Sequence, residues 1–312
     1  MNAKMKLLIA YDGSDCAAAA VHDLRRAGLP PETEALVLSV ADVWLPPQGA
    51  DEDGTPAPIA VQRGRKQAAE AFKAAYQLAE SGCELVHGQF PAWETRAEAA
   101  ADSPAWAIIK RASEWPTDLI LVGSQGHSAL HRAMLGSVSQ KVVNEAPCSV
   151  RVARRHAAAA DAPVRLVIGV DGSAEADAAV QAAATRVWPT GSEARLITVM
   201  DEKMATIIAA PLEAITGWME DGDENERAWV ERMIAAATEK LRAAGLKVSS
   251  VVHDGDPKSL LIEEAERWGT DCIFVGARGH GLLERLLIGS VASAVAARAH
   301  CSVEVVRPQQ TA

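Results

Sequence analysis

Short apolar runs alternate with helix-like stretches along the whole chain, and the pattern occurs twice. The first apolar run of each half ends in Asp-Gly-Ser, at residues 12–14 and again 159 positions later at residues 171–173. An Ala-rich helical stretch follows each of them, with Ser14 and Ser173 suited to be N-caps. Mostly apolar strands that alternate with helices predict an α/β fold, in which helices cover both faces of a parallel sheet.

The pattern predicts five strands in each half. Second strands are expected at residues 35–42 and 194–201, third strands at 84–89 and 247–253, fourth strands at 118–122 and 271–275, and fifth strands at 148–153 and 301–306. These third strands imply an insertion of about ten residues before Pro104, which corresponds to Pro257. We expect the strand order 3-2-1-4-5 in each Rossmann-like half, because strands one and four then meet at the reversal point, where ligands of open sheets bind.

A chain of 312 residues is long enough for two domains of ordinary size. The repeat places them at residues 1–155 and 162–312, joined by a linker at residues 156–163. The halves differ after the second strand. The first has a Pro- and Gly-rich stretch at residues 45–58, which predicts a mobile loop, and the second has an apolar stretch at residues 204–218, which either packs on the sheet or contacts a partner.

A glycine-rich loop with the pattern G-x2-G-x9-G-S follows the fourth strand of each half. Residues 115–137 and 268–290 are identical at 12 of 23 positions, including every residue of this pattern. The pattern residues are Gly123, Gly126, Gly136 and Ser137 in the first half and Gly276, Gly279, Gly289 and Ser290 in the second. Two matching loops predict two matching sites.

Glycine suits a loop that binds an anion, because a missing Cβ lets backbone N–H groups approach a phosphate. The helix that follows adds unpaired N–H donors and a partial positive charge. Ser137 and Ser290 are placed either to cap that helix or to bond a phosphate oxygen. The alternative is structural, since Gly-rich turns also connect strands to helices.

The composition excludes several classes of protein. Hydrophobic residues make up 49% of the chain and charged residues 23%, as in an ordinary globular protein, and no apolar run approaches a membrane span. A net charge of −10 argues against nucleic-acid binding. The five cysteines form no C-x-x-C pair, so we expect neither disulfides nor a metal site, and we place the protein in the cytoplasm.

At this point the chain resembles the universal stress protein family, in particular its tandem two-domain members. The resemblance extends from Lys4 to Arg307. It rests on "YDGS" and "VDGS" after the first strands, "GDP" at residues 255–257, the paired "GxxGH" loops, and "GSV" leading to "APCSV" and "AHCSV". In this family the pattern G-x2-G-x9-G-[ST] marks the branch that binds ATP, and both halves have it in full.

The resemblance implies one adenine-nucleotide pocket in each half. Asp12 and Asp171 would hold the ribose or adenine end, although an Asp before Gly also forms a simple turn. The base would meet the backbone around Val40 and Val199. The ribose and phosphate passage would be lined by Val122, Gly123 and Gly126 and by Val275, Gly276 and Gly279. The phosphates would reach Gly136, Ser137 and Val138 and their counterparts Gly289, Ser290 and Val291.

The two loops differ in charge at their third residue. Gln125 stands where the second loop has Arg278, so the sequence predicts tighter triphosphate binding in the second pocket, with Arg278 as a phosphate ligand. His127 and His280 follow the second loop glycines, either as phosphate donors or as solvated side chains.

The resemblance favours an ATP-binding regulatory protein of the stress response. Its cofactor would be ATP, or ADP or AMP, with Mg²⁺, and its protein partner is unknown. Two alternatives stay open: a slow ATPase or nucleotidyl transferase, and an adaptor protein with empty pockets. The missing P-loop lysine argues against the enzyme, and no catalytic residue is assigned. In this family fifth strands pair subunits, so we expect an intramolecular pseudo-dimer and, as a further step, a homodimer.

Overall fold

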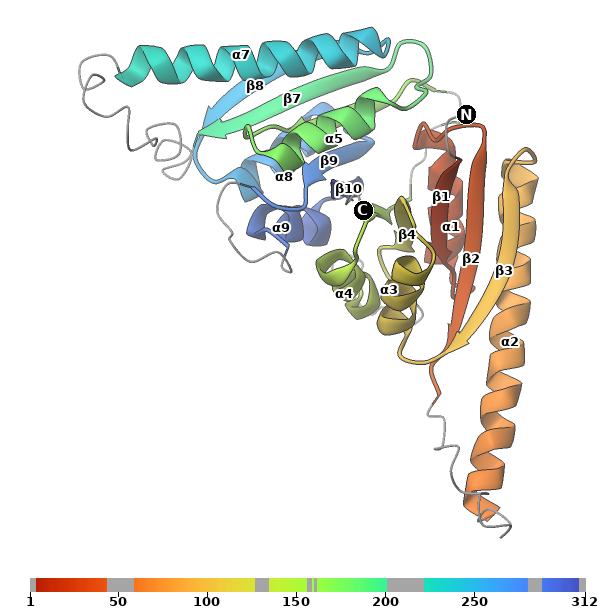
Figure 1. Cartoon of the computed structure of the whole chain (residues 1–312). Coiled ribbons are helices and arrows are strands. Elements are labelled where there is room, and N and C mark those ends of the chain that lie inside the picture. The colour runs from red at the N-terminus through yellow and green to blue at the C-terminus, as the bar shows by residue number, and fades with distance from the viewer. Residues whose placement is uncertain are drawn as a thin grey trace.

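The computed structural model of the chain is a single ten-stranded sheet with helices on both faces (Figure 1). It describes residues 4–43, 59–126, 135–155, 159, 162–200, 222–279 and 288–308. The stretches at residues 45–58 and 204–218 lie outside the described residues, as do His127 and His280.

The first half contains five strands and four α-helices among its described residues. Its strands are β1 Met5–Ala10, β2 Thr33–Ala41, β3 Glu94–Ala101, β4 Leu119–Gly123 and β5 Ser149–Ala153. Its helices are α1 Asp15–Asp23, which continues into the short 3-10 helix η1 Leu24–Arg26, then α2 Ile59–Gln89, α3 Pro104–Glu114 and α4 Ser137–Glu145.

The second half repeats this order. Its strands are β6 Arg165–Gly169, β7 Glu193–Met200, β8 Lys247–Asp254, β9 Cys272–Gly276 and β10 Ser302–Val306. Its described helices are α5 Ala174–Ala184, α7 Gly222–Ala243, α8 Pro257–Trp268 and α9 Ser290–Arg298.

Each half has the predicted strand order. The whole sheet runs β3-β2-β1-β4-β5-β10-β9-β6-β7-β8, so both halves read 3-2-1-4-5 from their outer edge, and within each half the strands are parallel. The predicted α/β fold is therefore confirmed. Strands β1 and β4 are neighbours, as are β6 and β9, which places the residues after them at one edge of the sheet.

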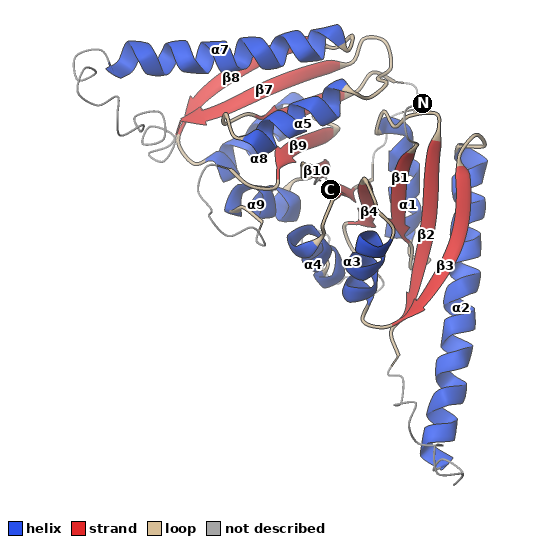
Figure 2. Ribbon diagram, in the orientation of Figure 1, coloured by secondary structure: helices blue, strands red, loops and turns tan. Residues whose placement is uncertain are grey.

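Helices cover the two faces of the sheet in separate groups (Figure 2). Along β1, Leu8 joins a core with α3, α4, α8 and α9, whereas Leu7 and Ile9 join a core with α1 and α2 on the opposite face. In the second half α5 and α7 cover that opposite face. The core beneath α3, α4, α8 and α9 is continuous through both halves, so the two domains share buried apolar surface.

One strand prediction was wrong. Residues 84–89 are the last residues of helix α2, and the third strand of the first half is β3 at Glu94–Ala101. The buried residues of α2, such as Ala75, Ala79 and Val86, recur at helical spacing and pack on the sheet. The corrected strand lies 153 positions before β8, the same offset as Pro104 and Pro257, so the first half has no insertion between its third strand and Pro104.

The fifth strands pair with each other, as expected. Strand β5 is antiparallel to β10, with Val152 opposite Val303 and Arg151 opposite Glu304. Two equivalent contacts flank this pairing. The backbone N–H of Arg154 donates to Ser302 Oγ at 3.0 Å, and that of Arg307 donates to Ser149 Oγ at 3.1 Å. The chain is thus a pseudo-twofold pair of domains, while association into a homodimer stays a prediction.

The centre of this pairing breaks the symmetry with buried charges. Arg151, which is 1% exposed, donates from Nε to Asp23 Oδ2 at 2.7 Å and lies 3.4 Å from Glu304. Arg186 completes the group by pairing with Glu304 and donating to the carbonyl of Ala27 at 2.7 Å. Burial lowers the pKa of Arg186, whereas the surrounding carboxylates raise that of Arg151. Two arginines therefore match two carboxylates in a buried interface.

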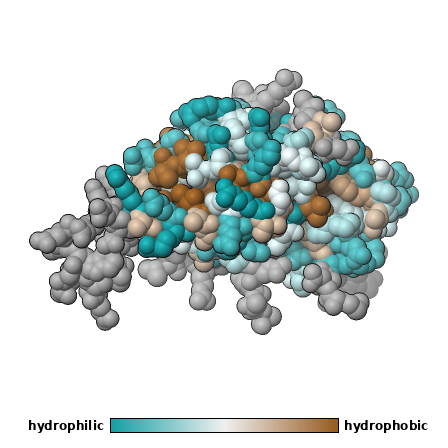
Figure 3. Space-filling view, turned by 90° about the horizontal axis from the view of Figure 1, so that it is seen from above, coloured by the Kyte–Doolittle hydropathy of each residue, from teal (hydrophilic) through white to brown (hydrophobic). Residues whose placement is uncertain are grey.

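The surface seen from above carries several separate apolar patches with hydrophilic residues between them (Figure 3). Exposed large apolar side chains of the described residues include Phe72 and Tyr76 on α2 and Trp106 on α3. Within the described residues, no helix is long and apolar enough to span a membrane.

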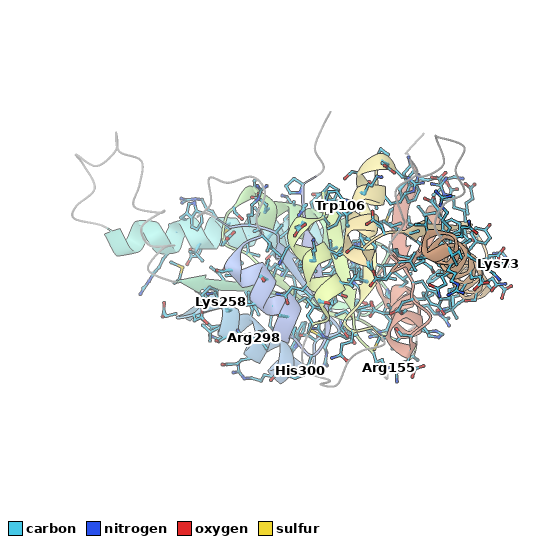
Figure 4. The ribbon with its side chains drawn as sticks, turned by 90° about the horizontal axis from the view of Figure 1, so that it is seen from below. Lys73, Trp106, Arg155, Lys258, Arg298 and His300 are labelled. Atoms are coloured by element: carbon cyan, nitrogen blue, oxygen red, sulfur yellow. The ribbon has the colours of Figure 1, made fainter. Side chains whose placement is uncertain are left out.

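We predict that Arg151→Met destabilises the protein by about 3–5 kcal/mol, because Asp23 would stay buried without its cation and Glu304 would keep only Arg186. The matched control is Arg155→Met. Arg155, labelled in Figure 4, pairs with Asp15 at 3.4 Å on the exposed surface, so its loss should cost about 0.5 kcal/mol or less. Urea unfolding of both variants measures the difference. Equal losses of unfolding free energy would mean that the buried ion pairs of Arg151 contribute no more to stability than the exposed pair of Arg155.

Candidate functional site

The site of each half begins in the turn after its first strand. Gly13 has a φ of 77° and Gly172 a φ of 81°, a left-handed backbone that favours glycine. Each turn leads into a helix capped by serine: Ser14 Oγ accepts from the N–H of Ala17, and Ser173 Oγ accepts from that of Ala176, both at 3.1 Å. The predicted N-caps are confirmed, and α1 and α5 therefore start at fixed positions.

Asp12 and Asp171 each use one carboxylate oxygen within this turn. Asp12 Oδ1 accepts from the N–H of Ser14 at 3.0 Å, and Asp171 Oδ1 accepts from that of Ser173 at 2.9 Å. The turn-forming role left open by the sequence is therefore real. It orients the carboxylate and directs the second oxygen, Oδ2, toward the glycine loop.

The second glycine of each loop passes against that carboxylate. A Cβ on Gly126 would lie 2.9 Å from Asp12 Oδ2, and one on Gly279 would lie 2.6 Å from Asp171 Oδ2. A side chain at either position would push the carboxylate away. The structure thus brings the predicted aspartates and loop glycines together in both halves.

The first glycine of each loop passes against the first turn of the capped helix. A Cβ on Gly123 would meet the backbone of Cys16 at 3.2 Å, and one on Gly276 would meet the backbone of Glu175 at 2.6 Å. Packing therefore requires glycine at position 276 and leaves little space for a side chain at position 123, whatever the loop binds.

Each loop closes at the start of the next helix. The N–H of Gly136 donates to the carbonyl of Ser124 at 2.8 Å, and that of Gly289 donates to the carbonyl of Ala277 at 2.7 Å. The N-caps of α4 and α9 are these glycines, without a side-chain cap, so Ser137 and Ser290 are the first helical residues and the capping role considered for them was wrong. Both serines are exposed, beside the first N–H groups of a helix.

The predicted valines lie around these loops at different depths. Val122 and Val275 are buried in β4 and β9, directly before the first glycine of each loop. Val138 and Val291, the second residues of α4 and α9, pack on the shared core. At the carboxyl ends of β2 and β7, Val40 is partly exposed and Val199 is buried at 8% exposure.

Arg278 has a partner that the sequence alone did not indicate. Arg278 pairs with Glu175 in the first turn of α5, with 2.9 Å between Nη2 and Oε1. In the first half the equivalent positions hold the uncharged Gln125 and Cys16. The repeat does align Glu175 with Cys16, since each lies two residues after its serine N-cap. Only the fold shows that this position lies against the glycine loop.

The cysteines near the fifth strands are unsuited to nucleophilic chemistry. Burial raises the pKa of Cys148 and that of Cys301 to about 12, so both thiols stay protonated at neutral pH. They pack against the shared core, in agreement with their interpretation as small apolar residues.

Tandem, doubly wound domains with a glycine loop at each sheet reversal define a class of α/β protein with two equivalent sites. The chain belongs to the universal stress protein family, whose sequence profile matches residues 5–154 and again residues 164–307. A universal stress protein of Mycolicibacterium smegmatis is 30% identical over 61% of this chain and 62% of its own length. One from Mycobacterium tuberculosis is 27% identical over 78% of this chain and 77% of its own.

Solved structures agree on the fold. A universal stress protein from Archaeoglobus fulgidus aligns with a TM-score of 0.62 at 20% identity, covering 97% of this chain and 98% of that one. A putative universal stress protein from Pseudomonas aeruginosa aligns with a TM-score of 0.59 at 15% identity, covering 98% and 94%. Both alignments include the two halves together.

We predict that Gly276→Ala destabilises the protein more than Gly123→Ala does. Neither glycine has a positive φ, so the difference comes from packing. The new methyl group would overlap the backbone of Glu175 at 2.6 Å, which has to move, whereas the contact with Cys16 at 3.2 Å needs only a small shift. Overpacking of this kind costs about 1–3 kcal/mol. Thermal unfolding of the two variants gives the order, and a reversed order would contradict the geometry.

Proposed function

We propose that the protein binds adenine nucleotides, ATP above all, with one pocket in each half, and acts as a regulatory protein of the stress response. The main support is the contact between each glycine loop and the aspartate that ends the first strand, with Gly126 at Asp12 and Gly279 at Asp171. The same arrangement occurs twice, at the sheet edge where ligands of this fold class bind.

The proposed pocket residues form three groups, which contact the ribose, the base and the phosphates of the nucleotide. Carboxylate oxygens of Asp12 and Asp171 accept hydrogen bonds from ribose hydroxyls. The backbone after Val40 or Val199 borders the base. Phosphates meet the N–H groups at the start of α4 or α9, where the N-cap is Gly136 or Gly289 and no side-chain cap competes with the anion.

Magnesium would enter with the nucleotide in this proposal. Mg²⁺ keeps several waters and binds mainly to substrate phosphates, with one or two carboxylates, rather than to a cage made of protein alone. The exposed Ser137 and Ser290 hydroxyls are available to phosphate or to an ion that the phosphates carry.

The residues around the loops favour a regulatory role through nucleotide binding over a catalytic one. Phosphoryl transfer needs a positioned metal and charge stabilisation at the leaving group. Arg278, at the third position of the second loop, is already paired with Glu175, and the first loop has the uncharged Gln125 at that position. Nucleotide loading is therefore the event that we expect to change the protein's interactions.

We expect calorimetric titration with ATP and Mg²⁺ to give two binding sites per chain. Asp12→Ala and Asp171→Ala should each weaken one site by about ten- to a hundredfold, because each removes a charged hydrogen-bond acceptor from the ribose. The double variant should lose both sites.

The control for this titration is Asp15→Ala. The Asp15→Ala substitution also removes one carboxylate charge near Asp12. The Asp15 side chain, however, is 93% exposed and pairs with Arg155. The substitution should leave both sites intact. Absence of any binding at millimolar nucleotide would reject the proposal. Native mass spectrometry of the freshly purified protein gives an independent reading, since a co-purified adenine nucleotide favours the nucleotide-binding role over an adaptor with empty pockets.

A further inference from the structure

The ion pair between Arg278 and Glu175 joins the glycine loop of the second half to the first turn of α5. The guanidinium and carboxylate are 2.9 Å apart, and the two side chains are only 28% and 17% exposed. The partial burial of both groups makes this contact stronger than a fully exposed ion pair of the same length.

Arg278 also lies at the mouth of the proposed phosphate site. A Cβ built on Gly289, the N-cap of α9, would be 3.3 Å from the Cα of Arg278. From this position the Arg278 side chain can pair with either of two anionic groups. One is Glu175, which holds it in this structure, and the other is an anion seated at the start of α9.

The first half has neither member of the pair. Gln125 replaces the arginine and Cys16 replaces the glutamate, while the surrounding glycines are the same. The sum of the two formal charges is zero in both halves. The tighter triphosphate binding predicted from Arg278 alone thus ignores a carboxylate that cancels it.

We propose that Glu175 sets the phosphate preference of the second pocket by competing with the nucleotide for Arg278. This inference rests on the proposed nucleotide-binding function. A triphosphate that reaches the start of α9 gains the guanidinium only by breaking its ion pair with Glu175, and it then lies close to the carboxylate that it displaced. A monophosphate, with a shorter anionic tail, makes little use of Arg278. The glutamate therefore removes most of the advantage that the arginine would give to ATP over AMP.

The decisive variant is Glu175→Gln, studied in the full chain with the first pocket weakened by Asp12→Ala. Glutamine keeps the size of the side chain and removes its charge, so Arg278 becomes available to phosphate. We expect the affinity for ATP with Mg²⁺ to rise about tenfold, as for one added charge-assisted hydrogen bond. The affinity for AMP should change by less than about twofold. Calorimetric titration with each nucleotide measures the ratio, and thermal unfolding verifies that the variant is folded.

The first loop provides a matched graft. Gln125→Arg introduces the arginine opposite Cys16, which has no charge to hold it, and should raise the ATP affinity of the first pocket when the second is weakened by Asp171→Ala. Adding Cys16→Glu to the same chain should cancel that gain. This pair of variants tests the competition without altering the second pocket's own residues at these positions.

The possible failures are distinguishable. If the parent chain binds neither ATP nor AMP, the proposed function fails and this inference fails with it. If nucleotides bind but Glu175→Gln leaves the ratio of ATP to AMP affinity unchanged, the competition is overturned while the proposed function stands. An equal rise for both nucleotides would also overturn it, because Glu175 would then repel any anion instead of controlling Arg278.

Discussion

The close passage of the glycine loop against the turn that follows the first strand is the constraint on which both sites depend. Parallel strands β1 and β4, and likewise β6 and β9, are neighbours at the sheet reversal, so two chain segments leave the sheet at the same point. A Cβ at Gly276 would overlap the backbone of Glu175, and one at Gly279 would displace the carboxylate of Asp171. The packing requirement and the proposed chemistry coincide here, because a backbone without side chains is both what fits and what an anion can approach.

Pairing of β5 with β10 turns two small open sheets into one, and its chemistry makes the two halves unlike. Flanking contacts from Arg154 and Arg307 to the partner half's serines are equivalent and would suit any two copies. At the centre, however, Arg151 faces Glu304. Two identical first halves would bring arginine against arginine in this register, so the buried charges favour pairing between unlike halves. The repeat accounts for the symmetry of the pairing, and the difference between Arg151 and Glu304 makes β5 pair with β10 rather than with a second β5.

Hydrophobic periodicity and the repeat were enough to predict the strand order, both serine N-caps and the meeting of Asp12 with its glycine loop. The misplaced third strand has a physical reason. Residues 84–89 contain apolar positions that fit a short strand, while the actual strand β3 is rich in alanine and acidic residues and half-exposed, as an outer strand can be. Local patterns cannot rank these alternatives, because the length of α2 is set by its packing on the sheet.

The ion pair between Arg278 and Glu175 could not be predicted by comparing the two glycine loops alone. Compared at the third position of the glycine motif alone, the second loop has the cation Arg278 and the first has the uncharged Gln125. The fold adds the first turn of α5, where Glu175 balances the arginine at 2.9 Å, and the first turn of α1, where Cys16 adds nothing. The two substitutions come from segments about a hundred residues apart and make sense only together, as a change that preserves net charge. In the proposed competition, the pockets therefore differ in whether a ligand can draw a guanidinium out of an ion pair, rather than in the sum of the charges at these positions.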